Sequence, residues 1–154
     1  MGYYDSFCDI IRRSFFSENL KGEYVSMVVD EDFISSACKE MEITEEDLIL
    51  NIKSFMFSYP LASLKKNKIL SLGVIALQNY VTALRGDSTK GDASAYRRIL
   101  CKLLKIDEAT LADWFSTYQQ DFWGSFYQWC EENDFKVYEV KVSTGPWRYV
   151  RYML

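Results

Sequence analysis

The chain of 154 residues contains no histidine. This absence excludes Ser-His-Asp and Cys-His catalysis, histidine acid–base chemistry and the common zinc sites that use imidazole. An enzyme of this composition would have to work with carboxylates, lysine, tyrosine or cysteine, and no catalytic or cofactor motif is present. We therefore expect a non-catalytic protein with no catalytic residue, metal or cofactor, and we keep a histidine-free enzyme that uses carboxylates or cysteine as a second alternative.

Glycine and proline are scarce, with seven and two residues, so we expect few long irregular loops. The longest apolar run, "ILSLGVIAL" at 69–77, is far too short to span a bilayer. The N-terminal residues show no basic region followed by an apolar stretch, which is the pattern of a secretory signal. No two of the four cysteines have the close spacing of a zinc or redox motif. We expect reduced thiols in an intracellular, cytoplasmic protein.

A basic surplus is also missing, because 18 basic and 22 acidic side chains give a net charge of −4. Nucleic-acid-binding domains usually carry positive charge, since the neutralisation of phosphates supplies much of their affinity. The charge therefore disfavours nucleic acid as the partner. Hydrophobic residues make up 49% of the chain, which is enough for a folded core.

The spacing of apolar residues predicts a mainly α fold, a compact bundle of about five to seven helices. Thr44, Asp92 and Asp107 are expected to cap helices, and 23–29 is expected to be a short strand or the lead-in to a helix. Alternation with period two predicts a C-terminal β-hairpin over 135–154, with its turn at 143–146. The predicted helices cover residues 3–17, 30–41, 44–57, 65–84, 93–105 and 108–133.

We expect one helical domain over 1–154. The alternative is two lobes, 1–84 and 92–154, joined by the loop 85–91, which is rich in Gly, Ser, Thr and Asp. The final residues, "RYVRYML", still have a strand pattern, which suggests a piece of a larger protein or a strand that a partner completes. The sequence does not determine the oligomeric state.

Residues 33–55 and 96–118 align without a gap and predict an internal repeat. Each stretch contains a helix, one isoleucine before a two-residue turn, an acidic cap and a second helix. Five of the 23 aligned positions are identical, including Cys38 with Cys101 and Ile43 with Ile106. The predicted unit is a helical corner in which the isoleucine plugs the space between two helices.

One copy, "ILCKLLKIDEATLADWF" (99–115), resembles the repressor-type helix-turn-helix. Leu103 and Leu104 take inward positions, Ile106 lies at the turn, and Leu111 lies on the second helix. The resemblance implies a DNA-binding corner, with Arg97, Arg98 and Lys102 as the nucleic-acid-binding residues of this alternative. In that family the second helix presents polar and basic groups to the bases. Here its exposed positions would include Glu108 and Asp113, and two acids oppose binding to phosphates.

The segment 112–135, "ADWFSTYQQDFWGSFYQWCEENDF", holds nine of the 25 aromatic residues. Phe115, Tyr118, Phe122, Phe126 and Trp129 follow one helical stripe, which predicts core packing. Trp123 and Tyr127 lie off the stripe, and aromatic residues beside arginine are typical of interface hot spots. We therefore expect an accessory, inhibitory or regulatory module whose partner is another protein or another domain of the same protein. The expected partner-binding residues are Trp123, Tyr127, Trp147, Arg148, Tyr149, Arg151 and Tyr152.

Overall fold

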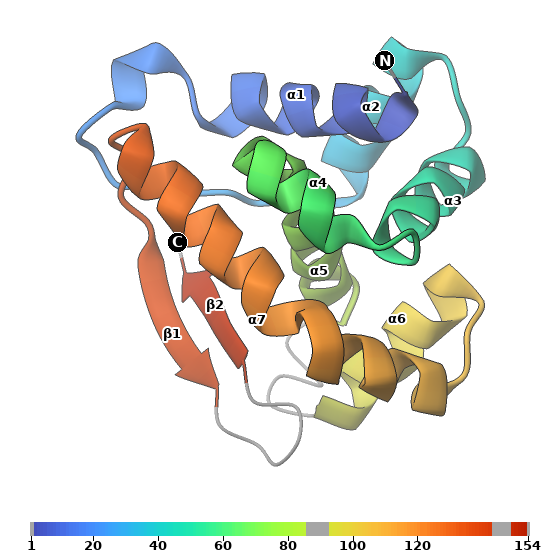
Figure 1. Ribbon diagram of the computed structural model, residues 1–154. Coiled ribbons are helices and arrows are strands. Elements are labelled where there is room, and N and C mark those ends of the chain that lie inside the picture. The colour runs from blue at the N-terminus through green and yellow to red at the C-terminus, as the bar shows by residue number, and fades with distance from the viewer. Residues whose placement is uncertain (1, 86–92, 143–148, 154) are drawn as a thin grey trace.

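The computed structural model describes residues 2–85, 93–142 and 149–153, and for the two strands among them it describes the backbone alone. Seven α-helices account for most of these residues, so the prediction of a mainly helical, compact fold is confirmed (Figure 1). The helices are α1 (Tyr3–Phe15), α2 (Glu31–Met41), α3 (Glu45–Met56), α4 (Pro60–Lys66), α5 (Leu72–Arg85), α6 (Ala93–Leu104) and α7 (Glu108–Glu132). Two short 3₁₀ helices, η1 (Glu18–Leu20) and η2 (Lys68–Ser71), lie between them.

Side-chain caps set where α3 and α7 begin. Thr44 Oγ1 accepts a hydrogen bond from the Asp47 N–H at 3.0 Å, and Asp107 Oδ1 accepts one from the Thr110 N–H at 2.8 Å. These bonds satisfy N–H groups that have no partner inside the helix. Both predicted caps are confirmed. Asp92, the third predicted cap, lies outside the described residues.

The single helix predicted over 65–84 is wrong, because the chain breaks at Asn67. This residue is extended (φ −151°, ψ 102°), and its side chain accepts a hydrogen bond from the Ile69 N–H at 3.3 Å. Lys65 and Lys66 therefore end α4, and α5 starts only at Leu72. The asparagine competes with the backbone for the first hydrogen bonds of a new turn, so it ends one helix and begins another.

The segment 23–29, predicted as a strand or a lead-in, is extended but forms no strand of its own. Its odd-numbered residues Val25, Met27 and Val29 are buried in the core. The side chain of Asn79 holds the segment from α5: its Oδ1 accepts from the Val29 N–H at 2.7 Å, and its Nδ2 donates to the Met27 carbonyl at 3.1 Å. One parallel bridge joins Tyr24 to Lys136.

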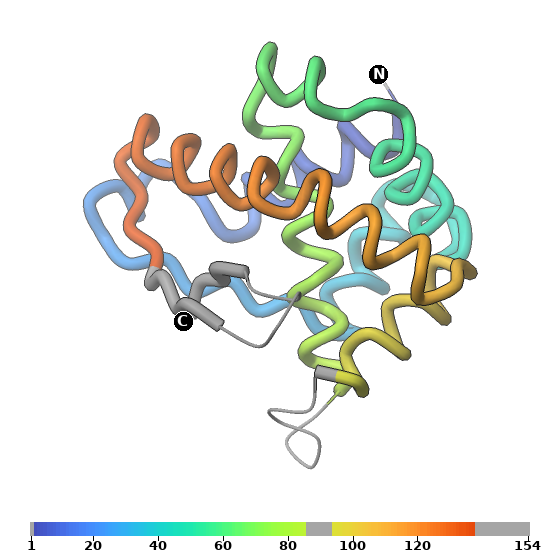
Figure 2. Tube along the Cα trace, turned by 60° about the horizontal axis from the view of Figure 1, so that its bottom comes forward, coloured from blue at the N-terminus to red at the C-terminus, as the bar shows by residue number. Residues whose placement is uncertain are grey.

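Helix α5 is the centre of the structure, and α7 crosses it (Figures 1 and 2). Every residue from Leu72 to Gln78 is buried, so α5 has no solvent-facing side along its first two turns. One core cluster contains residues from Tyr4 to Phe135, with α1, α3, α6 and α7 packed around α5. None of the described helices is both long and apolar enough to cross a membrane.

Two strands follow α7. β1 (Tyr138–Val142) pairs antiparallel with β2 (Tyr149–Met153), from Tyr138 opposite Met153 to Val142 opposite Tyr149. The strands lie beside α7, and β2 is in contact with it (Figure 1). The predicted turn at 143–146 lies outside the described residues.

The two stretches that align in sequence form corners with the same backbone geometry. Glu42 (φ 58°) and Lys105 (φ 55°) both take the left-handed conformation. The next residues, Ile43 and Ile106, donate their N–H groups to the carbonyls of Cys38 and Cys101, at 3.0 and 3.1 Å. The caps Thr44 and Asp107 follow at once. Each corner therefore uses a left-handed residue, an apolar residue and a cap, in that order.

Candidate functional site

Trp123 is not part of a surface, although it was predicted to bind a partner. Only 4% of its side chain is exposed, and its indole N–H donates to Gln78 Oε1 at 3.1 Å. Tyr127 is half-buried, with its ring centroid 5.8 Å from that of Trp123. The prediction for Trp123 is wrong because α5, 45 positions earlier in the chain, covers this side of α7.

The other residues of that predicted surface are near the C-terminus. Trp147 and Arg148 lie outside the described residues. Tyr149, Arg151 and Tyr152 belong to β2, where only the backbone is described. For these five residues, partner binding stays a prediction.

Two glutamines join α5 to α7 where the helices cross. Gln78 Nε2 donates to Gln119 Oε1 at 2.8 Å, and Gln119 Nε2 donates back to Gln78 Oε1 at 2.9 Å. Both side chains are buried, and Gln78 Oε1 also accepts from Trp123. Because these buried polar groups bond to one another, the cluster fixes how the helices cross and leaves no group aimed at a ligand.

Three large side chains on α3 and in the turn after it stay exposed. Leu50 is 51% exposed and Phe57 is 41% exposed. They are seven positions apart, which is two helical turns, so they lie on one face. Tyr59 follows in the turn into α4 and is 85% exposed. Leu50, Phe57 and Tyr59 are named here the α3–α4 patch.

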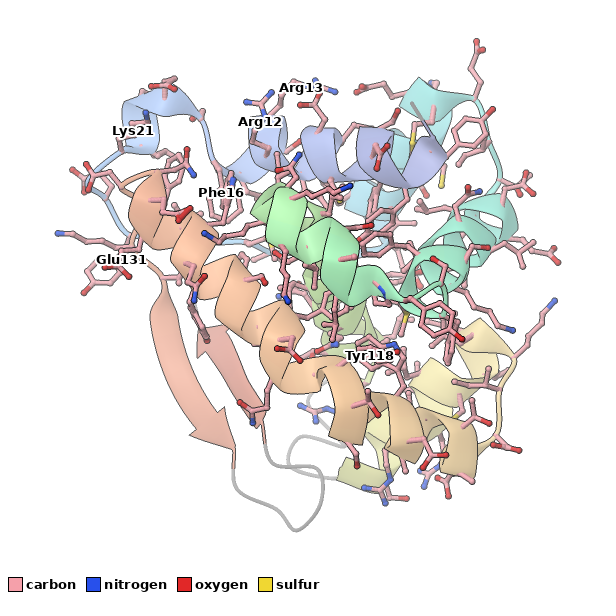
Figure 3. The ribbon with its side chains drawn as sticks, in the orientation of Figure 1. Arg12, Arg13, Phe16, Lys21, Tyr118 and Glu131 are labelled. Carbon is pink, nitrogen blue, oxygen red and sulfur yellow. The ribbon has the colours of Figure 1, made fainter. Side chains whose placement is uncertain are left out.

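The middle of α7 borders the patch. The Trp114 indole N–H donates to the carbonyl of Met56, the last residue of α3, at 2.9 Å. The Tyr118 ring lies 5.8 Å from the Trp114 ring, centroid to centroid, and Tyr118 is half-buried. Figure 3 shows Tyr118 on α7 beside the turn that joins α3 to α4. The patch therefore lies on a surface built from two helices and a turn.

Tyr59 has a strained backbone. Its φ of 54° and ψ of 61° place it in the left-handed region, which costs a non-glycine residue about 1–2 kcal/mol. Proline follows it, and a proline disfavours helical conformations in the residue before it. Pro60 is buried and starts α4, so the packing of this proline holds the turn in place. Burial of the Tyr59 ring does not offset the strain, because the ring projects into solvent.

Three lysines lie on the parts of α3 and α4 that flank the patch. Lys53 lies between Leu50 and Phe57 along α3, and the exposed Lys65 and Lys66 end α4. In the part of the chain that the structure describes, none of these three lysines forms an ion pair. Exposed acids lie at the two ends of the patch. Glu46 and Asp47 are one turn before Leu50, and Glu46 pairs with Lys105 Nζ at 3.2 Å. Asp121 is one turn beyond Tyr118.

The residues of the nucleic-acid alternative lie on α6. Arg98 and Lys102 are exposed and Arg97 is half-buried. The Arg98 guanidinium donates to Ser94 Oγ at 2.5 Å. At the start of α7, Glu108, Ala109 and Asp113 are exposed and Ala112 is half-buried. The helix that would face DNA in a helix-turn-helix thus presents two acids.

The cysteines do not have the properties of activated nucleophiles. Burial raises the pKa of Cys8 and of Cys130 to about 12. Burial is also the main cause of the raised pKa values of Cys38 and Cys101. A catalytic thiol needs a lowered pKa, because the thiolate is the reactive form. Among the described residues, no three Cys, Asp or Glu side chains are arranged to hold a metal ion.

Comparison with models of protein families, with curated proteins and with solved structures found no match to this chain. The candidate site therefore depends on the geometry alone. Sequence reasoning did not identify the α3–α4 patch, although a signal is present: Leu50 and Phe57 fall on the face of α3 opposite to its buried residues Leu48, Ile49, Ile52 and Met56.

Proposed function

We propose that this chain is a non-catalytic protein–protein interaction module, an accessory or regulatory domain that binds a partner protein through the α3–α4 patch. One observation carries the proposal. In the corner built from α2 and α3, two exposed positions on and directly after the second helix are apolar, and in the corner built from α6 and α7 the equivalent positions are polar.

The two corners are related by a shift of 63 positions, so each serves as a control for the other. Leu50 corresponds to Asp113, and Phe57 corresponds to Gln120. All four side chains are exposed. A corner of this geometry therefore forms without an apolar residue at the position of Leu50, and stability of the corner does not explain this leucine. An exposed apolar cluster that the fold does not require is typical of a binding surface.

Photo-crosslinking tests the proposal. A benzophenone amino acid replaces Tyr59 in one protein and Tyr24, which is also exposed but lies in the extended segment, in a second protein. In cells that contain the native partners, we expect a discrete crosslinked protein at position 59 that is missing at position 24. Adding Phe57→Gln to the first protein should remove the crosslink. If position 59 captures nothing, or captures the same proteins as position 24, the proposal is wrong.

We also propose that the corners are copies of one unit, repeated at 33–55 and 96–118, and that the hairpin over 135–154 carries a second part of the binding surface. The matched backbone hydrogen bonds of the corners support the first point. For the second point, alanine at Trp147 and Arg148 should weaken partner binding. Unchanged binding of these alanine variants would restrict the interface to the α3–α4 patch.

Nucleic-acid binding is the second candidate, supported by the corner of α6 and α7 and its resemblance to a helix-turn-helix. A mobility shift that weakens with salt, and that Arg98→Glu and Lys102→Glu remove, would favour it. Because Glu108 and Asp113 are exposed on the second helix, we expect no shift even at low salt.

A further inference from the structure

We propose that the partner of the α3–α4 patch is a short acidic amphipathic segment, in which apolar anchors alternate with Asp or Glu. This inference rests on the proposed function and specifies the chemistry of the partner. It is drawn from the size of the patch, the spacing of its apolar groups and the charges beside them.

The size of the patch fits a peptide segment. With aromatic side chains of roughly 150–250 Å² each, the exposed parts of Leu50, Phe57 and Tyr59 amount to on the order of 300 Å². A stable interface between two globular proteins buries about 800 Å² on each side. The patch supplies less than half of that area, whereas a segment of two to four turns needs only a few anchored side chains.

The spacing of the patch sets the spacing of the partner's anchors. Leu50 and Phe57 are separated by about 10.5 Å along the helix axis, at 1.5 Å per residue. A helical segment laid along α3 would match them with apolar residues at positions i and i+7, filled in at i+3 or i+4. Tyr59 follows two positions later in a turn that is fixed before the buried Pro60, so its backbone loses little conformational freedom on binding.

The lysines select an acidic partner. Lys53 lies between Leu50 and Phe57 along α3. Lys65 and Lys66 are the last two residues of α4, at the end of this helix that is farther from Tyr59. Since none of the three has an ion pair in the described structure, a partner can engage them without breaking existing pairs. Glu46, Asp47 and Asp121, at the outer ends, would repel an acidic segment only where it extends past the patch, and the ion pair with Lys105 partly neutralises Glu46. Charges of this kind determine which partner binds and how fast it associates.

Selection from a random peptide library tests the inference, because such a library does not presuppose an acidic or amphipathic partner. A display library of random 16-residue peptides is panned on the wild-type chain at low salt. Counter-selection uses the variant Phe57→Gln/Tyr59→Gly. Glutamine is the residue that the other corner carries at this position, and glycine takes the left-handed backbone of Tyr59 without strain, so this variant should fold. Its thermal unfolding is compared with that of the wild type.

The selected peptides are then synthesised, and their affinity is measured by fluorescence anisotropy. We expect a consensus with a net negative charge and apolar residues at i, i+3 or i+4, and i+7. Lys65→Glu/Lys66→Glu should weaken binding roughly tenfold, since two exposed ion pairs become repulsive. Lys39→Glu/Lys102→Glu makes the same change of charge on two exposed lysines of α2 and α6 and should leave the affinity within twofold.

The possible outcomes separate the two claims. Neutral or basic peptides that require Phe57 and Tyr59 would overturn the acidic partner and leave the binding module in place. Equal weakening by both pairs of lysine variants would overturn the inference too, because it would mean that only the total charge matters. Peptides that bind the counter-selection variant as well as the wild type would overturn the patch and the proposed function together.

Discussion

Gly73 is the position where the backbone of α5 leaves no room for a side chain. A Cβ atom added to Gly73 would lie 2.4 Å from Cε1 and 2.7 Å from Cζ of Tyr4, whereas carbon atoms in contact are about 3.5–4.0 Å apart. The Tyr4 ring is stacked on Phe55, with centroids 4.2 Å apart. Its hydroxyl donates to the Leu70 carbonyl and accepts from the Val74 N–H at 3.2 Å. The ring therefore cannot move away without losing these contacts.

We expect Gly73→Ala to lower the free energy of unfolding by about 1–5 kcal/mol. Overpacking costs about 1–3 kcal/mol. The two hydrogen bonds of the Tyr4 hydroxyl contribute about 0.5–1.5 kcal/mol each. The higher helix propensity of alanine returns about 1 kcal/mol. Gly124→Ala is the control, because nothing lies within 4 Å of a Cβ there; in the long helix α7 it should stabilise the protein by about 0.5–1 kcal/mol.

The assay is urea unfolding followed by circular dichroism, in a double-mutant cycle with Tyr4→Leu. The smaller side chain should make room for the new methyl group. In that background, Gly73→Ala should cost less than about 1 kcal/mol, so the two substitutions should couple strongly. If Gly73→Ala were as stable as the wild type, or cost the same with leucine at position 4, close packing against Tyr4 would not be the reason for this glycine.

Three further predictions follow from buried or capping groups. Gln78→Leu should cost about 2–3 kcal/mol, because it leaves the Gln119 amide buried without its partner, and adding Gln119→Leu should recover part of the loss in urea unfolding. Cys8 should react with a thiol reagent at pH 8 only after unfolding, whereas the half-buried Cys101 should react first in the native protein; a fast reaction of Cys8 would contradict its burial. The hydrogen bond from the Thr110 N–H lowers the pKa of Asp107, so the stabilisation that the Asp107 carboxylate gives the fold is present above its unfolded pKa near 3.8 and is lost as the pH falls through the folded value. Asp107→Asn should flatten this part of the pH–stability curve. An unchanged curve would refute the contribution of the cap.

Local chemistry in the sequence predicts most of the helices. Thr44 and Asp107 form their cap bonds with residues three positions ahead, so the signal for each helix start lies within one turn. The predicted helix at 44–57 is one residue longer than α3 at each end, and the predicted helix at 108–133 starts with α7 and ends one residue beyond it. The break at Asn67 was missed because apolar residues continue on both sides of it, and their periodicity outweighed one cap residue.

The roles of the aromatic residues depend on contacts that are distant in sequence. Trp123 and Tyr59 are both large rings outside a regular stripe. One is buried because Gln78 lies 45 positions earlier on a crossing helix, and the other is exposed because the turn before Pro60 takes a left-handed conformation. Neither fact is visible in the neighbouring residues. Hydrophobic periodicity could therefore assign the stripe of α7 to the core, but it could not determine which of the remaining rings reach the surface.

The alignment of the two corners contains information about exposed positions that helical periodicity alone does not. When two copies of a corner share their caps and their left-handed turns, differences at equivalent exposed positions reflect constraints other than the corner itself. Leu50 against Asp113 and Phe57 against Gln120 are such differences, and they can be identified in the sequence once the shift of 63 positions is fixed. The structure adds that all four side chains are exposed, which removes core packing as the explanation. The comparison is closest for Leu50 and Asp113, which both lie inside a helix, whereas Phe57 directly follows α3 and Gln120 lies within α7. The proposed binding surface gives a reason for apolar side chains at positions where the other corner carries polar ones.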